Sequence, residues 1–391
     1  WSVGWVDNVN PDGKFPRRAI GINGKFPADP LTVNSDDFVH INFTNKFGDG
    51  RPSTLHGHGL FFTNVNYYDG AASVTQCPVP DGYSFYQEIL NSPKSGEKSP
   101  KQWGTYWLHG HQVAIRQRYS VLVKARNETD KNWRIHANME GGTFPKVGSL
   151  KLNLTGTLTY GQNDAKMGDG KKNRRTDVKP FDDTKLVPVE KIESNQPDMR
   201  VTLEVKMKEG RKHGKPMGLI NGTTYVAPKT PTMLTMTAKN TTNPMHAGTY
   251  GRNVNAVTAP YNSMVEMTIL NLSDDVHPFH MHGTKFQVVH RAYGSDGKKP
   301  QVPEVDKLEN PVRRDTVAVD GFGSVTIRFL ASNPGAWFMH CHMDWHLSAG
   351  LAMVMVQAPE KAKEVLKVPS YVEEQCKVWQ KQSDHKKLRG P

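Results

Sequence analysis

Short runs in which apolar and polar residues alternate recur along the chain. They include Leu150, Leu152 and Leu154, then Val201, Leu203, Val205 and Met207, and later Val325, Ile327 and Phe329. Successive residues of a strand point to opposite faces, so this period of two predicts β-strands with one buried face. Turn residues separate the runs, a pattern typical of antiparallel β-sandwiches or barrels. Helix is scarce in this pattern. The best candidate is Pro359 to Leu366, which carries proline in its first turn and lacks strand alternation.

Two motifs occur twice, once near each end of the chain. The pattern H-x-H-G-x-x-F is found at His56–Phe62 and again at His280–Phe286. The pattern G-x-x-[WF]-x-H-x-H is found at Gly104–His111 and again at Gly335–His342. Self-similarity of this kind indicates duplication. We therefore expect two related β domains, one first and one last.

The repeated motifs contain paired histidines. Sixteen histidines in 391 residues give about 0.65 H-x-H pairs by chance. The chain has four: His56/His58, His109/His111, His280/His282 and His340/His342. On a strand, residues i and i+2 face the same side, so each pair can direct two imidazoles at one metal cluster. Eight imidazoles that converge where two duplicated domains meet predict a multinuclear site.

A second set consists of His277, Cys341 and His346. One thiolate and two imidazoles in a trigonal arrangement form a blue-copper electron-transfer centre. Cys341 lies between His340 and His342, so on a strand its sulfur faces away from both imidazoles. Leu351, ten residues after the cysteine, cannot ligate, and a missing axial donor predicts a high reduction potential.

Zinc is the main rival to copper, because imidazole and thiolate also suit zinc. Eight paired imidazoles with a separate cysteine site do not fit a closed tetrahedral zinc site. The run from His340 to His342 would connect an electron-accepting copper to a metal cluster through a few bonds. This arrangement suits oxidation of a one-electron donor at the surface and four-electron reduction of dioxygen inside.

Taken together, these residues resemble the multicopper oxidases, and most closely the fungal iron-uptake ferroxidases and laccases. The resemblance is carried by His277–Gly283, Trp337–His346, the earlier H-x-H pairs, Thr75–Pro78 and Arg313–Thr316. It implies an all-β fold of cupredoxin-like Greek-key β-sandwich domains, four copper ions and dioxygen as the electron acceptor. The donor would be a phenol or Fe(II), and a ferroxidase would have an iron permease as partner. We expect a monomer.

The resemblance also implies a role for each matching residue. His277, Cys341 and His346 would hold the mononuclear type 1 copper, and His56 and His280 the type 2 copper. The binuclear type 3 pair would be held by His58, His109, His111, His282, His340 and His342. Asp69 and Asp344 would help deliver protons to reduced oxygen, although either could simply be a solvent-facing aspartate. Residue chemistry alone predicts one disulfide and one functional thiolate, with three unrelated thiols as the alternative. The family pattern implies that the disulfide joins Cys77 and Cys376.

The chain departs from this family in length. Soon after His111, the segment Ala114–Val121 already resembles a late strand of a second domain, so on the order of a hundred residues are missing. We expect a first domain at residues 1–112, a partial second domain at 113–199 and a third at 200–391 with the blue copper site. The middle domain is either shortened or incompletely represented in the sequence. We favour the second explanation, because deleting closing strands would leave unpaired edges.

Two alternatives stay open at this point. Asp274 and Asp275 lie close to the position of an iron-binding carboxylate in the ferroxidases, but they are offset from it, so either could be an iron contact or a polar loop residue. A noncatalytic copper-binding or storage cupredoxin is the competing function, and oxygen uptake during donor oxidation would distinguish it from an oxidase.

Charge and targeting signals complete the picture. The net charge of +12 comes from dispersed basic residues without a nucleic-acid-binding motif, so we expect no nucleic-acid partner. No apolar run approaches the roughly 20 residues that cross a bilayer. The chain starts at Trp1 without a leader, and N-x-[ST] sequons begin at Asn42, Asn127, Asn153, Asn221, Asn240 and Asn271. These features predict a secreted protein or the ectodomain of a surface protein.

Overall fold

The computed structural model describes residues 1–10, 15–34, 37–90, 106–110, 130–138, 151–160, 183–209, 215–294 and 297–387. The chain divides into two compact units. The larger comprises Trp1–Gly4, Gly21–Arg118 and Thr184–Pro391, and the smaller comprises Trp5–Ile20 and Tyr119–Asp183. In the larger unit we call residues 21–118 the first region and residues 184–391 the last region.

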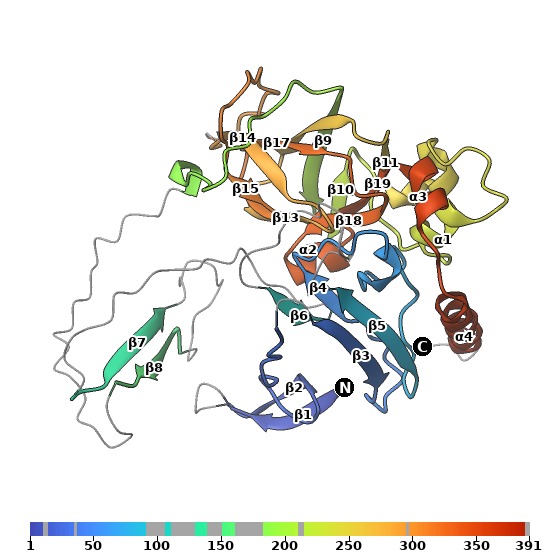
Figure 1. Ribbon diagram of the computed structural model, residues 1–391. Helices are drawn as coiled ribbons and strands as arrows, with labels where there is room; N and C mark the ends of the chain where they lie inside the picture. The colour runs from blue at the N-terminus through green and yellow to red at the C-terminus, as the bar shows by residue number, and fades with distance from the viewer. Residues whose placement is uncertain are drawn as a thin grey trace. The chain divides into compact units, whose positions relative to one another are not determined.

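The strands before residue 110 include two that carry histidines of the H-x-H pairs. The strands in this part of the chain are β1 (Ser2–Val9), β2 (Arg17–Ile22), β3 (Phe38–Asn45), β4 (His56–His58), β5 (Ser84–Leu90) and β6 (Trp107–His109). One sheet has the order β2-β1-β3-β5, and β4 pairs with β6 in a separate two-stranded ladder (Figure 1). Because β4 and β6 are antiparallel with His56 opposite His109, the two ends of this ladder carry histidines.

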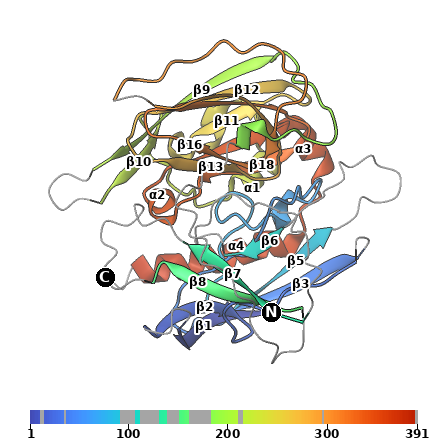
Figure 2. The same ribbon diagram turned by 90° about the vertical axis from the view of Figure 1, so that its left-hand side faces the viewer.

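The last region is a β-sandwich of two sheets. Its strands are β9 (Met199–Lys208), β10 (Met217–Ile220), β11 (Ala256–Ala259), β12 (Met264–Asn271), β13 (His277–Met281), β14 (Phe286–Ala292), β15 (Arg313–Arg314), β16 (Thr316–Val319), β17 (Ser324–Leu330), β18 (Gly335–Cys341) and β19 (Ala352–Gln357). The sheets have the orders β10-β9-β12-β17-β14-β15 and β11-β19-β18-β13-β16. Figure 2 shows β9 and β12 in one layer and β13, β16 and β18 in the other.

Apolar side chains from both sheets fill the space between these layers. Every residue of β12 is buried, and Met267 and Ile269 are fully enclosed. The alternating runs at 201–207 and 325–329 form β9 and β17, which confirms both predicted strands. The core also contains Cys341 and Leu351. A residue predicted to bind metal is therefore built into the hydrophobic core of the sandwich.

Four α-helices occur in the described residues, namely α1 (Thr232–Thr237), α2 (Asp344–Ser348), α3 (Pro359–Val365) and α4 (Ser370–Lys387). The predicted helix at 359–366 is confirmed as α3. The longest helix, α4, was not predicted, because few of its positions are apolar and the burial of Val372 and Cys376 gives too little periodicity. None of the helices in the described ranges has the length and apolar character needed to span a bilayer.

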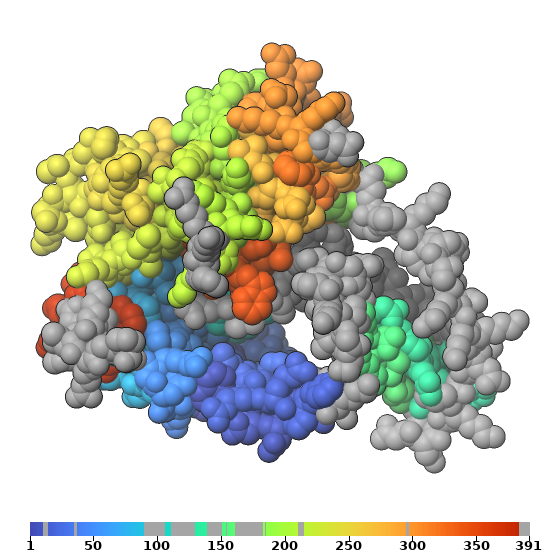
Figure 3. All heavy atoms as spheres, turned by 180° about the vertical axis from the view of Figure 1, so that it is seen from behind, coloured from blue at the N-terminus to red at the C-terminus, as the bar shows by residue number. Residues whose placement is uncertain are grey.

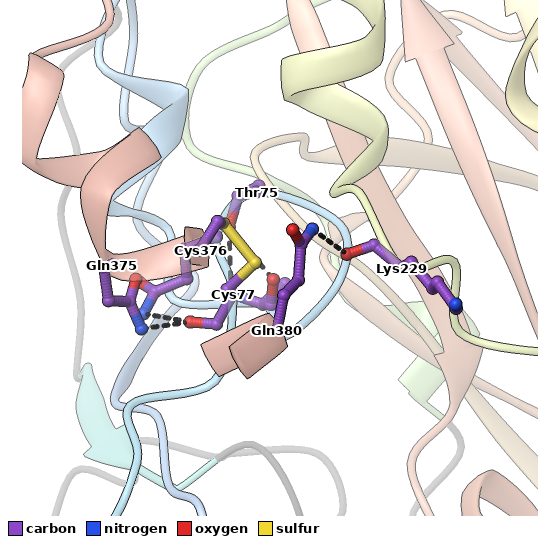
Figure 4. The surroundings of a disulfide bond; sticks show 8 residues. Thr75, Cys77, Lys229, Gln375, Cys376 and Gln380 are labelled. Carbon is purple, nitrogen blue, oxygen red and sulfur yellow. Dashed lines mark hydrogen bonds between the residues drawn. A yellow bond between two sulfur atoms is a disulfide. The ribbon is translucent and has the colours of Figure 1, made fainter. Parts of the chain in front are cut away.

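A disulfide joins α4 to the first region. Cys77 and Cys376 form it across 299 residues of sequence. Figure 4 shows the Gln375 side chain donating a hydrogen bond to the Cys77 carbonyl over 2.6 Å. In the same view the Gln380 amide reaches the carbonyl of Lys229. The end of the chain is therefore fixed to both regions of the larger unit.

Buried amides also hold the two regions together. Asn66, which begins the 3-10 turn Asn66–Tyr68, donates from Nδ2 to the Ala336 carbonyl over 3.0 Å. The Ala336 N–H returns a bond of 3.1 Å to Asn66 Oδ1. Asn333 donates to the carbonyl of Phe61 over 2.7 Å. Figure 3 shows the light-blue surface of the first region lying against the yellow-green surface of the last.

The smaller unit contains an antiparallel hairpin of β7 (Trp133–Asn138) and β8 (Asn153–Leu158). The predicted strand at Leu150–Leu154 overlaps β8, although Leu150 lies outside the described residues. The domain boundaries at 112 and 199 stay predictions, because most of residues 113–182 also lie outside the described ranges.

Candidate metal centre

Seven of the eight paired histidines lie in one buried cluster. They are His56, His58, His109, His280, His282, His340 and His342, and none exposes more than 8% of its surface. His111 lies outside the described residues. Strand pairing explains the convergence, because β4 meets β6 in the first region and β13 meets β18 in the last. In the second pair His280 stands directly opposite His340.

Histidines of the first region stack face to face on histidines of the last. The rings of His56 and His282 lie 3.9 Å apart, and those of His58 and His280 lie 3.8 Å apart. The Nε2 atoms of His282 and His340 approach to 3.2 Å. Imidazoles from both ends of the chain therefore converge on shared points, as a multinuclear site requires.

Hydrogen bonds leave the inward-facing nitrogens available to a metal. The Nδ1 atoms of His56 and His280 are 2.6 and 2.8 Å from the carbonyls of Asp69 and Asp315. His282 Nδ1 lies 2.8 Å from the Asp69 carboxylate. When Nδ1–H donates to a carbonyl or carboxylate, Nε2 keeps a free lone pair. Histidines that bind a metal usually make such a hydrogen bond through their other ring nitrogen. The Nε2 atom of His280 is buried and has no hydrogen-bond partner among the described residues.

Burial favours the neutral form of three imidazoles in the cluster, those of His109, His280 and His342. Desolvation, together with the neighbouring imidazoles, lowers the pKa of His342 to about 3. The same causes place the pKa of His109 and His280 well below the ordinary histidine value. Neutral imidazole is the form that binds metals. His109, His280 and His342 are therefore in the metal-binding form at neutral pH.

The second set of residues lies on the other side of β18. His277 begins β13, Cys341 ends β18 and His346 lies in α2. The two Nδ1 atoms are 3.0 Å apart, and the sulfur is 3.8 Å from that of His277 and 3.5 Å from that of His346. A point equidistant from these atoms lies about 2 Å from each, which is the length of a metal–imidazole bond. One thiolate and two imidazoles at this spacing match a trigonal copper site.

Electrostatics distinguish the two histidines of this set. Burial, reinforced by the nearby His346, lowers the pKa of His277 to about 3. Burial also lowers the pKa of His346, and the negative charge of Asp275 opposes that shift. Asp275 is exposed. An acidic side chain at the surface is therefore close enough to His346 to influence it.

Leu351 is tied to two of the three predicted ligands. Its carbonyl accepts the Cys341 N–H and its own N–H donates to the His346 carbonyl, both over 3.0 Å. Gly218 of β10 packs directly against it. A Cβ at position 218 would lie 2.6 Å from both the Cβ and the N of Leu351. This packing holds a side chain without a donor atom beside the Cys341 site.

Three carboxylates lie in or beside the site. Asp69 is fully buried against His56 and His282, and this burial raises the pKa of its carboxyl, although His56 opposes the rise. Asp344 is half-buried at the start of α2. Asp315, for which the sequence analysis predicted no role, has Oδ1 3.5 Å from His58 Nε2. The only feature of the sequence that could have pointed to Asp315 as a site residue was its position in the Arg313–Thr316 motif.

The donor set fits copper. Within the described part of the chain, four groups of three potential ligands have their ligand atoms within 4.8 Å of one another: His56, His58 and His109; His56, His280 and His282; His277, Cys341 and His346; His58, His280 and Asp315. Imidazole suits copper, and the single thiolate with two imidazoles is the blue-copper combination.

Comparison with known proteins identifies the family. Two family models, both described as multicopper oxidase, match residues 5–123 and 225–361. The iron multicopper oxidase fer1 of Mycosarcoma maydis is 31% identical, covering 96% of this chain and 82% of that protein. The iron transport multicopper oxidase FET3 of Kluyveromyces lactis is 28% identical, with coverages of 92% and 76%. The chain belongs to the multicopper oxidase family.

Solved structures agree on the fold. The crystal structure of Fet3p, a multicopper oxidase that functions in iron import, matches with a TM-score of 0.84 and 24% identity over 97% of this chain and 94% of that chain. A laccase from Botrytis aclada matches with a TM-score of 0.70 and 18% identity over 97% and 91%. The predicted all-β, cupredoxin-like class is therefore confirmed.

Membership of this family settles the class of chemistry. The protein is a laccase- or ferroxidase-type oxidase that uses four copper ions and dioxygen, with a phenol or Fe(II) as donor. None of these relatives supports a noncatalytic storage function. The alignment with fer1 runs over 524 positions, whereas this chain has 391 residues. At least 133 aligned positions of the relative thus have no counterpart here.

Proposed function

We propose that the physiological donor is Fe(II) and that Asp275 helps to bind it. The observation that carries this proposal is the exposed Asp275 carboxylate acting on buried His346. Fe(II) is a cation for which a carboxylate oxygen is a suitable surface ligand. The names of the relatives, iron multicopper oxidase and iron transport multicopper oxidase, also support iron. By the same analogy, the oxidised iron passes to an iron permease.

The ligand roles form part of this proposal. We assign the type 1 copper to His277, Cys341 and His346, with Leu351 as the axial non-ligand, and the type 2 copper to His56 and His280. We assign the type 3 pair to His58, His109, His111, His282, His340 and His342. Copper bound at these positions supplies one-electron chemistry at the first site and dioxygen reduction at the others. His340 and His342 flank Cys341 directly, so the polypeptide itself connects the two sites.

The carboxylates handle protons in this scheme. Asp69 holds the Nδ1–H of His282 at its Oδ2 and lies within the cluster, where each water formed requires protons. Asp344, between His342 and His346 in sequence, is placed to pass protons inward from α2. An Asp344→Ala variant should keep all its copper and its blue colour, while oxygen uptake slows. Unchanged oxygen uptake would remove this role.

A donor comparison tests the iron proposal. The copper-loaded enzyme should oxidise Fe(II) more efficiently than a bulky phenol, as measured by kcat/KM. Asp275→Asn should lower kcat/KM for Fe(II) about tenfold, equivalent to about 1.4 kcal/mol, and leave the phenol unaffected. The neighbouring Asp274→Asn is the matched control and should behave as wild type. A preference of the unaltered enzyme for the phenol, or equal effects of both variants, contradicts the proposal.

We also propose that the protein is secreted or displayed at the cell surface. The Cys77–Cys376 disulfide and the sequons support this compartment. Asn42, Asn153, Asn221 and Asn240 are exposed, as a glycan requires. Asn271 is fully buried and its amide donates to backbone carbonyls, so this sequon is a structural asparagine. Mass spectrometry of the protein from its natural source should find glycans on the exposed positions and none on Asn271.

A further inference from the structure

Four tyrosines form a contact chain between the histidine cluster and the surface of the first region. The rings of Tyr67 and Tyr68 meet edge to face at 4.6 Å. The Tyr68 hydroxyl lies 2.6 Å from that of Tyr371 on α4. Tyr86 on β5 completes the chain, with its ring 6.4 Å from Tyr68 and 6.2 Å from Tyr371. Figures 1 and 2 show α4 beside β5, where these residues meet.

The inner end of this chain adjoins the cluster. Tyr68 is covalently followed by Asp69, whose carbonyl lies 2.6 Å from His56 Nδ1. One peptide unit and one hydrogen bond therefore separate Tyr68 from a cluster histidine. Gln87 fixes this turn by donating to the carbonyls of Tyr68 and Leu55. The Tyr68 side chain is buried.

The outer end has the groups that accept a phenol proton. The Tyr86 hydroxyl donates to Glu88 Oε1 over 2.9 Å. His40 Nδ1 bonds to the same hydroxyl, and it lies 3.6 Å from Glu88 Oε1. His40 stands opposite Glu88 in the β3–β5 ladder, so the sheet holds the three side chains together. The side chains of His40 and Glu88 are 53% and 31% exposed, which places this end in contact with solvent.

These observations match the requirements of a redox-active tyrosine. A phenol gives up an electron far more readily when its proton can move at the same time to a hydrogen-bonded base. The hydrogen bond from Tyr86 to Glu88 provides that base, and His40 remains bonded to the oxygen that would carry the radical. Among the described residues, neither Tyr68 nor Tyr371 has a hydrogen bond to a carboxylate, whereas Tyr86 has one to Glu88, so the oxidised state is best stabilised at Tyr86. The aromatic contacts supply a path from the interior.

We propose that Tyr86, with Glu88 and His40, is a second redox site at which the enzyme accepts electrons from small phenolic reductants when the main donor is short. In the first step Tyr86 loses one electron inward through Tyr68, and its proton moves to Glu88 Oε1. Dioxygen requires four electrons, and this electron replaces one that the main donor has not supplied. In the second step a phenol donates a hydrogen atom to the Tyr86 radical, and Glu88 releases its proton to solvent.

This inference rests on the oxidase chemistry and the ligand roles proposed above, but not on the choice of iron as donor. A purely structural role is the competing explanation, in which the tyrosines simply pack α4 against β5. Burial raises the pKa of Tyr67 to about 12 and raises that of Tyr68 further, so both hydroxyls stay protonated in either case. Packing alone predicts no radical, and the two explanations can therefore be separated.

The test is electron paramagnetic resonance of the copper-loaded full chain. The enzyme is reduced with fewer than four electrons per molecule, mixed with excess dioxygen and frozen rapidly. A tyrosyl signal should appear, and growth on ring-deuterated tyrosine should narrow it. Tyr86→Phe should lose this signal, whereas Tyr293→Phe, which alters an exposed tyrosine elsewhere, should keep it. Added phenol should shorten the lifetime of the wild-type radical.

Each possible result of this experiment either supports the proposal or contradicts it. Absence of a tyrosyl signal in the wild type, or an undiminished signal in Tyr86→Phe, overturns it. An undiminished signal in Glu88→Gln overturns the assigned proton acceptor. Copper content, blue absorption and Fe(II) turnover of Tyr86→Phe should equal those of the wild type, which shows that the variant is folded. Failure of the iron proposal would instead appear as poor Fe(II) turnover of the unaltered enzyme.

Discussion

The two faces of β18 carry two sites of different construction. Cys341 faces the hydrophobic core of the last region, and its partners His277 and His346 come from the same region. His340 and His342 face the histidine cluster, and three of its seven described histidines come from the first region. The cysteine site therefore depends on local packing. The cluster depends in addition on the docking of segments that are far apart in sequence.

This difference indicates which substitutions should affect one of the two metal sites without affecting the other. Changes to the sulfur should remove one site and spare the other. Changes to the contacts between the two regions should weaken the cluster first, because those contacts place His56 and His58 on His282 and His280. Four experiments address this separation.

Replacing the sulfur should have the largest effect. Cys341→Ser removes the only thiolate of the site, and the blue absorption should disappear completely. The cluster histidines keep their positions, because the serine side chain points into the same core. Copper analysis should find the cluster metals retained. A variant that loses all of its copper would show that the two sites are not separable.

Acid should weaken the metal-free protein strongly. The pKa of His277 and of His342 is about 3 in the folded protein, against about 6.5 in the unfolded chain. Between these values the unfolded chain binds more protons, so stability falls as the pH falls. Each histidine contributes about 1.4 kcal/mol per pH unit. Denaturant titrations of the metal-free protein from pH 7 to pH 4 measure this slope, and a flat profile contradicts it.

Removing the disulfide should cost less. The Cys77→Ser, Cys376→Ser double variant opens a loop that spans 299 residues, and the expected loss is about 2–5 kcal/mol of unfolding free energy. Because the disulfide joins α4 to the first region, cluster copper should be lost at lower denaturant than the blue colour. Simultaneous loss of both would mean that the regions unfold as one unit.

The smallest effect is expected at Asn66. Asn66→Ala leaves the buried N–H and C=O of Ala336 without their side-chain partner, which costs about 1–3 kcal/mol. Cluster copper should again be lost first in a denaturant titration, while the blue absorption of the folded variant stays normal. Asn243→Ala, at an exposed position that belongs to no sequon, is the control and should match the wild type.

The sequence predicted the metal-binding residues of the centre better than the helix and the tertiary contacts that hold them in place. Paired histidines at i and i+2 share one face of a strand whatever the surrounding fold, so the sequence predicted that each pair faces one site. The meeting of the pairs depends in addition on how the two regions dock. Strands β9 and β17 could be predicted because apolar and polar residues alternate in both, although in β17 the polar residues are buried too. The helix α4 was not visible, since it is held by Cys376 and a few contacts rather than by an apolar stripe.

Residues that act through tertiary contacts were also missed. Asn66 is an ordinary polar residue in the sequence, and only the structure shows its amide bound to Ala336, 270 residues away. Asp315 was part of a recognised motif, but its distance to His58 depends on how the two regions dock. The extent of the middle domain stays open for a different reason, because the sequence itself lacks the segment that would define it.

Gly218 shows how far control of the copper site extends. The residue touches neither sulfur nor imidazole, yet any side chain on it would push against Leu351. Because Leu351 is bonded to the backbones of Cys341 and His346, such a push would alter the geometry around the ion. A side chain at position 218 would therefore change the driving force for taking an electron from the donor, without changing a single ligand.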